Sequence, residues 1–385
     1  GGMNVYVLQL ARELALRGIS VDVFTRSHDP NDPMIVDLEA GARVVHLNAG
    51  PHEAAKQDLF DYIPAFLSEL FSFQRSEGTR YDLVHSHYWL SGRVGIPLSR
   101  MWEVPHMTTF HTLAKTKLRA RAGERESPQR IATESLIMRH VDGMIVSTEE
   151  EKHDLARLYG ARTCKINVVP AGVDLELFKP TDQQEARQVL GIRENQVILY
   201  VGRIEPLKGI EILLRAATLL ERTSDTRVLI VGGSPGNDAE LDRLKAVAVQ
   251  LDIADQVTFT GAVRQTELPR YYGAADIFVL PSHSESFGLA ALEAMACGTP
   301  VIVSRVGGLK TFVDSGKSGY LVPWHCPEAF AQRLETLLAN PALKDTMGEA
   351  ARAKALQMGW GHVADRTLEF YSGLLPDVWD SVAGD

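Results

Sequence analysis

Two glutamates, Glu285 and Glu293, stand in a segment whose pattern suits the binding of a polar ligand. The segment SESFGLAALEAMACGTPVI (residues 284–302) follows the apolar run Ile277–Leu280, so it begins where a buried strand is expected to end. We expect Glu285 on a loop and Glu293 roughly two turns into a helix over Phe287–Met295, so that the two carboxylates address different parts of one extended ligand. Free backbone N–H groups at the helix start add a site for an anion or hydroxyl group, and they belong to Phe287, Gly288 and Leu289.

A second segment, VGRIEPLKG (residues 201–209), suits a diphosphate. It follows the expected strand Val197–Val201, and Gly202 permits close approach of a ligand to the backbone. Arg203 and Lys208 place two cations at the end of that strand, where they can neutralise a departing diphosphate. An ordinary loop with two surface cations is the alternative, and the glutamate segment downstream favours the diphosphate site.

The first residues, Gly1-Gly2-Met3-Asn4, have the composition of a loop that enters a helix. Apolar spacing predicts this helix over Val5–Arg17, with Asn4 as its N-cap and Gly18 as its stop. The glycine pair lets a ligand touch backbone at the positive end of the helix dipole. The pair by itself is also a plain helix entry, which requires no function.

Polar residues follow two expected strands of the N-terminal half, at HSHYW (85–89) and TFHT (109–112). Histidine, tyrosine and threonine at strand ends suit a wall that binds sugar hydroxyls. The spacing alone does not choose His111 over His85 or His87, and a buried, hydrogen-bonded histidine is the common alternative.

A run of basic residues follows directly after the second of these strands, in an otherwise acidic chain. It comprises Lys115, Lys117, Arg119, Arg121, Arg125 and then Arg130. The run could receive a phosphorylated acceptor, or Lys115–Arg125 could touch an anionic membrane surface, and the sequence leaves both open. No Asp-x-Asp motif suited to Mg²⁺ is present, so we expect no metal, with charge on the leaving group neutralised by Arg203, Lys208 and helix dipoles.

The bulk composition limits the class of protein. The chain has 385 residues, which suits two domains, and its hydrophobic and charged fractions of 45% and 23% are those of a globular protein. A net charge of -9 argues against nucleic-acid binding. The three cysteines form no CxxC pair and no apolar run reaches about 18 residues, so we expect a reducing, cytoplasmic location.

Strand-like and helix-like runs alternate along the chain, which predicts doubly wound parallel sheets of the α/β class. This alternation of strand-like and helix-like runs is interrupted at PAGVDLELFKP (170–180), which we interpret as the connection between domains 1–174 and 175–360. Residues 361–385 are expected to form a helix that crosses back to the first domain. We also expect an upstream first strand that is absent here, because residues 1–4 look like a loop that follows a strand. The expected strands are 21–25, 44–47, 83–86, 107–110, 144–147, 166–169, 197–201, 228–231, 257–260, 277–280 and 300–304.

Taken together, these segments resemble the retaining, metal-independent glycosyltransferases of GT-B fold, carbohydrate-active family four. The resemblance covers nearly the whole chain and rests on five segments. These are GGMNVYV (1–7), HSHYWLSG (85–92), FHTLAKTK (110–117), VGRIEPLKG (201–209) and SESFGLAALEAMACGTPVI (284–302). It implies two Rossmann-like domains, no required cofactor, a nucleotide-sugar donor and transfer to a small acceptor. A UDP-sugar is favoured as the donor.

The resemblance also implies roles for individual residues. Arg203 and Lys208 bind the donor diphosphate, and the Gly2 loop approaches the leaving phosphate. Glu285 binds donor sugar hydroxyls together with the backbone of Phe287, Gly288 and Leu289, and Glu293 binds the ribose. His111 assists transfer.

Within the family, the N-terminal half is similar to that of members acting on inositol phosphate. The positions implied for the acceptor are Asn4, Lys56, Tyr88, Thr112 and Arg130. Sucrose-phosphate synthases, which use fructose 6-phosphate, are also similar, but they usually carry Gln where this chain has Met3. Transfer to a lipid at a membrane surface stays a further alternative, and homodimer formation is open.

Three other functions are less favoured. A nucleotide-sugar-binding protein without turnover would not need the full set of segments. A dehydrogenase would need GxGxxG, which neither half contains, and would leave the glutamates unexplained. A hydrolase would need its two carboxylates paired across one bond, whereas Glu285 and Glu293 are expected on a loop and within a helix.

Overall fold

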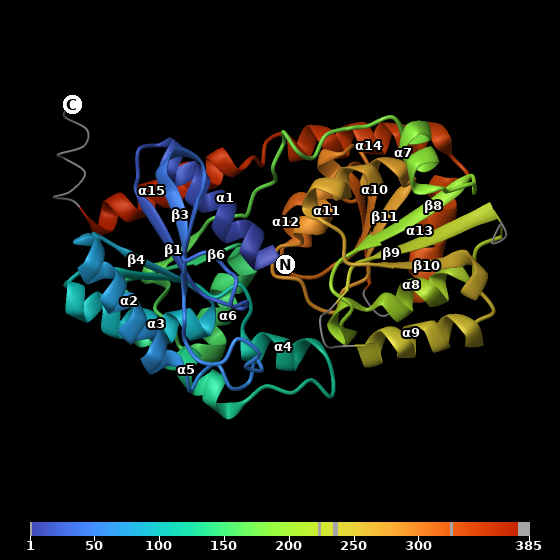
Figure 1. Cartoon of the computed structure of the whole chain (residues 1–385). Helices are drawn as coiled ribbons and strands as arrows, with labels where there is room; N and C mark the ends of the chain where they lie inside the picture. Colours follow the sequence, from blue (N-terminus) through green and yellow to red (C-terminus); the bar gives the residue numbers. More distant parts are fainter. Residues whose placement is uncertain (1, 222–224, 234–237, 324–325, 376–385) are drawn as a thin grey trace. The chain divides into compact units, whose positions relative to one another are not determined.

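The computed structural model describes residues 2–221, 225–233, 238–323 and 326–375, and it consists of two compact units (Figure 1). Unit 1 contains Gly1–Pro170 together with Trp360–Asp385, and unit 2 contains Ala171–Gly359. Among the described residues, no helix is long and apolar enough to cross a membrane.

Unit 1 contains two separate sheets. Strands β1 (Val21–Arg26), β3 (Ala42–Leu47) and β2 (Ile35–Asp37) form the first sheet in that order. The second sheet, in the order β4-β5-β6-β7, is parallel throughout. Its strands are β4 (Val84–His87), β5 (His106–Thr109), β6 (Gly143–Val146) and β7 (Ile166–Val168). The helices of unit 1 are α1 (Gly2–Leu16), α2 (Ile63–Glu77), α3 (Tyr88–Trp102), α4 (Ala114–Ala120), α5 (Pro128–His140), α6 (Glu149–Tyr159) and α15 (Trp360–Leu374).

Strand β2 is an exception to the predicted parallel arrangement, because it pairs with β3 in the antiparallel direction. It is three residues long and exposed along its whole length, and its apolar residues Ile35 and Val36 form too short a run to predict a strand. Antiparallel neighbours can be joined by a short connection, whereas parallel ones need a crossover. A 3-10 turn at Glu39–Gly41 joins β2 to β3.

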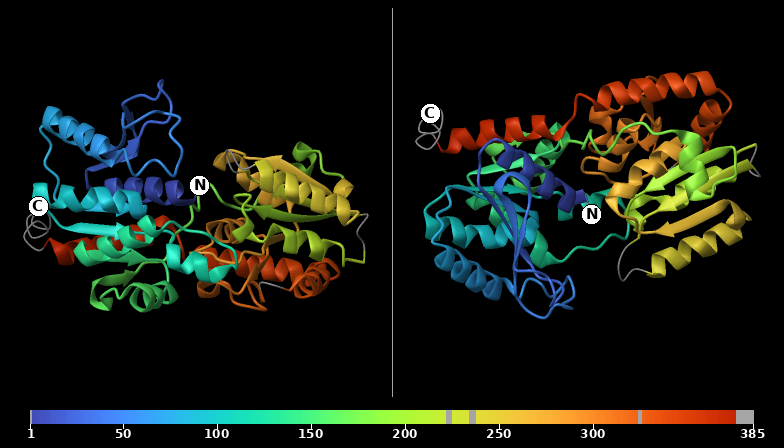
Figure 2. Two further views of the ribbon diagram at one scale, coloured as in Figure 1. Left: turned by 90° about the horizontal axis from the view of Figure 1, so that it is seen from below. Right: turned by 45° about the horizontal axis from the view of Figure 1, so that its top comes forward.

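Helix α1 begins at Gly2, three residues before the predicted start, so Asn4 lies inside the helix and is not its N-cap. Its buried face includes Tyr6, whose ring meets the edge of Trp360 at the start of α15. Arg17 joins the same two helices, since its Nε atom lies 2.6 Å from Asp365 Oδ1. The C-terminal helix therefore packs against the N-terminal one within unit 1 (Figure 1, Figure 2).

Unit 2 contains one parallel sheet in the order β10-β9-β8-β11-β12-β13. The chain moves outward from β8 through β9 to β10, then returns to the other side of β8 with β11. Such a reversal is the topological switch point at which doubly wound sheets bind ligands. The strands are β8 (Gln196–Val201), β9 (Thr226–Val231), β10 (Val257–Gly261), β11 (Ile277–Leu280), β12 (Val301–Ser304) and β13 (Gly319–Val322). The prediction of the α/β class is confirmed, although the sequence did not indicate β13.

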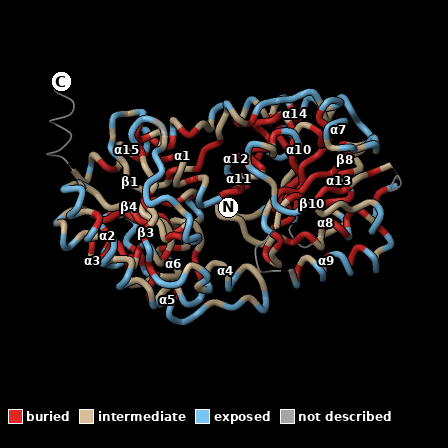
Figure 3. Tube along the Cα trace, viewed as in Figure 1, coloured by how far each residue is buried: buried red, intermediate tan, exposed pale blue. Residues whose placement is uncertain are grey.

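Helices cover both faces of this sheet, with α8 and α9 on one face and α10, α11 and α14 on the other (Figure 1, Figure 2). Strand β11 is buried along its whole length, as is β8 after its first residue (Figure 3). This burial explains why both read as continuous apolar runs. The helices of unit 2 are α7 (Gln183–Leu190), α8 (Ile210–Ala217), α9 (Asp238–Gln250), α10 (Leu268–Ala274), α11 (Leu289–Ala296), α12 (Leu309–Phe312), α13 (Pro327–Leu338) and α14 (Pro341–Ala355).

A buried carboxylate, Asp276, joins the sheet of unit 2 to two helices. Its side chain is 5% exposed and lies 2.6 Å from both Arg187 Nη2 of α7 and Lys344 Nζ of α14. It also accepts a hydrogen bond of 2.8 Å from the backbone N–H of Val197 in β8. Two cations and one backbone donor therefore depend on this single side chain.

We expect Asp276→Ala to lower the free energy of unfolding by about 3–5 kcal/mol, because it leaves two partly buried cations without their partner. Urea unfolding followed by circular dichroism would measure this loss. Glu211→Ala is the matched control, since Glu211 also pairs with two arginines but is 31% exposed. That control should cost under about 1 kcal/mol, and equal losses in the two variants would contradict the assigned role of Asp276.

Candidate functional site

The loops that follow β8 and β11 lie together at the switch point of the unit 2 sheet. The backbone N–H of His283 donates to the carbonyl oxygen of Leu207 at 2.8 Å, which joins the two loops directly. Gly209 adopts a positive φ of 64°, and a Cβ atom there would lie 2.2 Å from the carbonyl oxygen of Pro281. Only glycine permits this close packing of one loop against the other.

This packing brings Lys208 and Glu285 together, two of the residues predicted to form the donor site. Lys208 Nζ lies 2.7 Å from Glu285 Oε2, and the hydroxyl of Ser282 donates to the same oxygen at 3.2 Å. Both charged side chains are mostly buried, at 16% and 14% exposure. The ion pair holds Lys208 in one orientation and commits the Glu285 carboxylate to accepting hydrogen bonds.

Arg203 lies on the same loop in a more open setting, with 52% of its side chain exposed. It pairs with Glu205, a residue that the sequence interpretation did not single out. The hydroxyl of the buried Tyr200 donates to the carbonyl oxygen of Arg203 at 2.8 Å, which fixes the backbone of the loop. The guanidinium group itself stays accessible to a ligand.

Helix α11 begins at Leu289, two residues later than predicted, because Gly288 takes a left-handed conformation with φ 98°. Phe287 is buried, and the centre of its ring lies 5.2 Å from the centre of the Phe312 ring. Its side chain therefore belongs to the core, and only its backbone is left to meet a ligand.

Glu293 is the fifth residue of α11, so it lies just over one turn into the helix and not two. Its side chain is buried and accepts a 2.8 Å hydrogen bond from the hydroxyl of Tyr272. Burial raises the pKa of Glu293 to about 7, against the opposing effect of hydrogen bonds from Tyr272 and Gln265. An ordinary solvated helix residue would not be placed in this way.

In unit 1, the three histidines that the sequence could not separate lie side by side. His87 Nδ1 and His111 Nε2 are 2.9 Å apart, and His111 takes a left-handed φ of 60°. His85 contacts the hydroxyl of Tyr371, in α15, at 2.6 Å. Burial lowers the pKa of His85 to about 3 and that of His111 to about 4, so both rings are neutral at pH 7.

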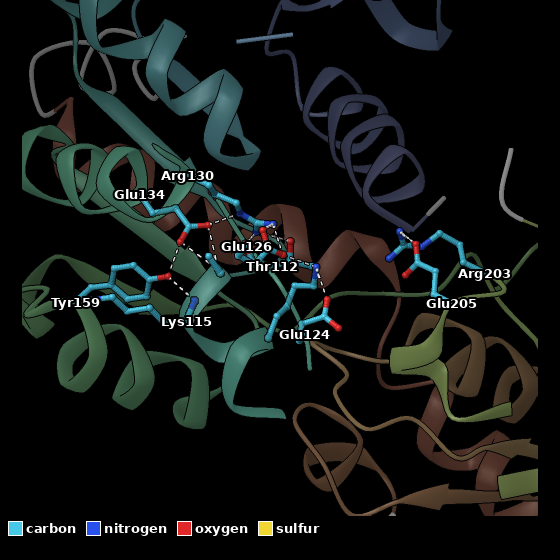
Figure 4. A network of polar contacts seen from close by, with 11 residues as sticks. Thr112, Lys115, Glu124, Glu126, Arg130, Glu134, Tyr159, Arg203 and Glu205 are labelled. Carbon is cyan, nitrogen blue, oxygen red and sulfur yellow. Dashed lines mark hydrogen bonds and ion pairs between the residues drawn. The ribbon is translucent and has the colours of Figure 1, made fainter. Parts of the chain in front are cut away.

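Four of the predicted acceptor residues also lie close together in unit 1. Arg130 Cζ and Lys56 Nζ lie 5.1 Å and 5.6 Å from the centre of the Tyr88 ring. Arg130 Nη2 donates to both the carbonyl and the hydroxyl oxygen of Thr112, at 2.9 Å and 3.1 Å (Figure 4). The structure places Asn4 on the exposed side of the first turn of α1.

Much of the basic run is paired, so it is less cationic than its sequence suggests. Lys117 forms ion pairs with Glu124 and Glu126, and Arg119 forms one with Asp154. Arg130 pairs with Glu126 and with the fully buried Glu134 (Figure 4). Sequence reasoning missed these carboxylates. Glu134 follows Arg130 by four residues within α5, a spacing that places both side chains on one face of a helix, whereas Glu126 precedes the helix and gave no such signal.

Other contributors gave no local signal in the sequence. Tyr272 and Tyr371 reach Glu293 and His85 from 21 and 286 residues away in the chain. Within the described residues, no group of three or more His, Cys, Asp or Glu side chains is arranged to hold a metal ion. Gly1 lies outside the described residues, and Gly2 is the first residue of α1.

Comparison with known proteins gives matches along the whole chain. A glycosyl transferase 4-like domain matches residues 1–172, and the glycosyl transferases group 1 family matches residues 182–354. The chain is 43% identical to D-inositol 3-phosphate glycosyltransferase of Kineococcus radiotolerans, with 98% of this chain and 91% of the relative covered. It is 44% identical to the protein of the same name from Corynebacterium jeikeium, with 98% of this chain and 92% of the relative covered. Among solved structures, the sucrose-phosphate synthase from Thermosynechococcus elongatus superposes with a TM-score of 0.90 at 35% identity, with 98% of this chain and 94% of that chain covered.

The geometry of the Glu285 loop can be tested at Gly307. This glycine has φ 47°, and a Cβ atom there would lie 1.6 Å from the carbonyl oxygen of Glu285. We expect Gly307→Ala to displace the loop and to weaken binding of UDP-glucose, whose sugar the loop is predicted to contact, about tenfold or more in calorimetry. Gly261→Ala is the control, since Gly261 also has positive φ but nothing within 4 Å of its Cβ position. Similar affinities in the two variants would show that the loop position is unimportant for binding.

Proposed function

This chain belongs to the group 1 glycosyltransferases of carbohydrate-active family four, and from this premise we propose that it transfers a sugar from a UDP-sugar to a hydroxyl group of inositol 3-phosphate. It is a glycosyltransferase that uses a nucleotide-sugar donor and a small-molecule acceptor.

The arrangement around Tyr88 is the observation that carries the choice of acceptor. Two cations, Lys56 and Arg130, lie over one aromatic ring beside the hydroxyl of Thr112. Guanidinium, ammonium and hydroxyl groups are the donors that bind a phosphate, and they suit the phosphate of a small acceptor. Relatives that share 43% and 44% of their residues with this chain are named for inositol 3-phosphate. We assign Asn4 to the inositol ring.

We assign the donor to the switch point of the unit 2 sheet. Arg203 and Lys208 bind the diphosphate, and the backbone at the start of α11 joins Glu285 in binding the sugar hydroxyls. Glu293 binds the ribose, because a buried carboxylate can accept hydrogen bonds from both ribose hydroxyls. The ion pair with Lys208 supports a recognition role for Glu285 over a nucleophilic one, since the carboxylate is already committed.

We propose that the reaction retains the configuration at the anomeric carbon. The bond from that carbon to the diphosphate oxygen breaks, and a bond to the acceptor oxygen forms on the same face. The proton of the acceptor hydroxyl passes to the leaving phosphate, whose charge Arg203 and Lys208 neutralise without a metal ion. His111 assists transfer as a neutral ring, in accord with its lowered pKa.

Fructose 6-phosphate is the second candidate acceptor. It is supported by the similarity to the sucrose-phosphate synthase of Thermosynechococcus elongatus, which extends over 98% of this chain. The same cations could bind the phosphate of either acceptor. The enzyme must therefore distinguish inositol 3-phosphate from fructose 6-phosphate by contacts with the rest of the acceptor molecule.

A matrix of donors and acceptors tests the proposed function. UDP-glucose and UDP-N-acetylglucosamine are each offered with inositol 3-phosphate, fructose 6-phosphate and unphosphorylated inositol, and release of UDP is measured. We expect inositol 3-phosphate to exceed unphosphorylated inositol about a hundredfold or more in kcat/KM, because charge-assisted contacts to the phosphate are lost in the neutral compound. Preference for fructose 6-phosphate would select the second candidate, and an inverted anomer in the NMR spectrum of the product would refute retention.

The raised pKa of Glu293 predicts a pH dependence of donor binding. Below its pKa of about 7 the carboxyl group is protonated and loses part of its capacity to accept hydrogen bonds. Its ionised fraction falls from about 0.9 at pH 8 to about 0.1 at pH 6, so the KM for the donor should rise about tenfold over that range. His85 and His111 do not titrate there, because their pKa values are about 3 and 4.

Glu293→Gln should remove this pH dependence and leave the donor KM high at both pH values. Glu211→Gln is a useful control, since hydrogen bonds from arginine side chains lower the pKa of Glu211 and this carboxylate stays ionised between pH 6 and pH 8. A wild-type KM that stays constant between pH 6 and pH 8 would argue against the ribose assignment.

A further inference from the structure

Arg130, the cation assigned to the acceptor phosphate, already has a hydrogen-bond partner on each of its three nitrogens. It donates through Nε to Glu134 Oε1 at 2.8 Å, through Nη1 to both oxygens of Glu126 at 3.0 Å, and through Nη2 to Thr112 at 2.9 Å and 3.1 Å. These contacts engage all three nitrogens of the guanidinium. A phosphate that takes two parallel N–H···O bonds from two nitrogens of Arg130 must therefore displace one of these partners.

Glu134 is held too firmly to be that partner. Its side chain is fully buried, and it accepts hydrogen bonds from the backbone N–H of Ala114 and from the hydroxyl of Tyr159 as well as from Arg130 (Figure 4). Removing it would leave buried donors unsatisfied, which is costly. Thr112 cannot leave by a side-chain movement alone, because one of the two oxygens that accept from Arg130 is its backbone carbonyl oxygen.

Glu126 is placed differently. It precedes Ser127, the N-cap of α5, and so belongs to the irregular segment between α4 and α5. It forms ion pairs with the side chains of Arg130 and Lys117, and both are cations. Its carboxylate faces Nη1 of Arg130 with both oxygens, so it occupies the part of the guanidinium from which a phosphate would accept N–H···O bonds.

We propose that Glu126 occupies the acceptor-phosphate site in the free enzyme and that the acceptor phosphate displaces it, so that Glu126 determines how much negative charge an acceptor must carry. A phosphate group brings up to two negative charges against the single charge of the carboxylate, and it can take over the contacts with Arg130 and Lys117. A neutral sugar cannot replace the carboxylate without leaving two cations unpaired. The enzyme thereby selects phosphorylated acceptors, and this inference rests on the proposed function of the Arg130 site.

Glu126→Gln removes the competing charge and provides the test. With UDP present to fill the diphosphate site, we expect this variant to bind inorganic phosphate about fivefold to tenfold more tightly than wild type in calorimetry, the scale of one lost charge-assisted contact. The KM for inositol 3-phosphate should fall in the same proportion, and discrimination against unphosphorylated inositol should weaken. Arg130→Ala should abolish the phosphate signal, which identifies the site that is measured.

Glu124→Gln is the matched control, because it removes an equal charge two residues away. Glu124 lies 3.3 Å from Lys117, and its ion pair with that lysine is separate from the contacts of Arg130. We expect its phosphate affinity to change less than about twofold. Equal gains in the Glu124 and Glu126 variants would indicate general charge repulsion and overturn the proposal.

Glu126→Asp separates displacement from repulsion while keeping the charge. A carboxylate shortened by one methylene loses its two-oxygen contact with Arg130, so displacement predicts tighter phosphate binding than wild type, whereas repulsion predicts no change. Weaker phosphate binding in the Gln variant would show that Glu126 only positions Arg130, and this too would overturn the proposal. If wild type does not glycosylate inositol 3-phosphate, the proposed function fails, while the phosphate-binding comparison still decides the role of Glu126.

Discussion

The parallel pairing of two buried strands, β8 and β11, determines where the chemistry of unit 2 can occur. The strands are neighbours in space although β9 and β10 come between them in the chain. Because parallel strands end at the same edge of a sheet, the loop bearing Lys208 and the loop bearing Glu285 emerge together. Glycines at 209 and 307 then allow contacts that any Cβ atom would prevent. The donor assignment depends on this combination of topology and close backbone packing.

Charge pairing is the second constraint, and it recurs in both units. Lys208 pairs with Glu285, Arg203 with Glu205, and Arg130 with Glu126 and Glu134. A cation that is partly removed from water is costly unless a carboxylate compensates it. An anionic ligand therefore enters a site whose cations already have partners, and binding is an exchange of partners. The strength of each internal pair then influences which ligand can complete the exchange.

Most strands could be predicted because burial on both faces imposes long apolar runs, as in β8, β9 and β11. The failures have equally physical causes. Strand β2 is exposed and three residues long, and β13 is a short strand with only its ends buried. The start of α11 was misplaced at Phe287 because Gly288 takes a left-handed conformation against Leu309, a contact distant in the sequence. The start of α1 was misplaced at Val5, and nothing in the structure explains its beginning at Gly2.

The sequence by itself determined the types of chemical group and their order: two cations after one strand, a glutamate after another, and histidines and a basic run in the first half. Local spacing can indicate this much because it fixes which residues follow a strand. Only the tertiary structure decided the pairing of these groups. It joins Lys208 to Glu285 across 77 residues and His85 to Tyr371 across 286. It also pairs Lys117, Arg119 and Arg130 of the basic run with carboxylates, because charges that are partly removed from water need partners wherever the fold brings them.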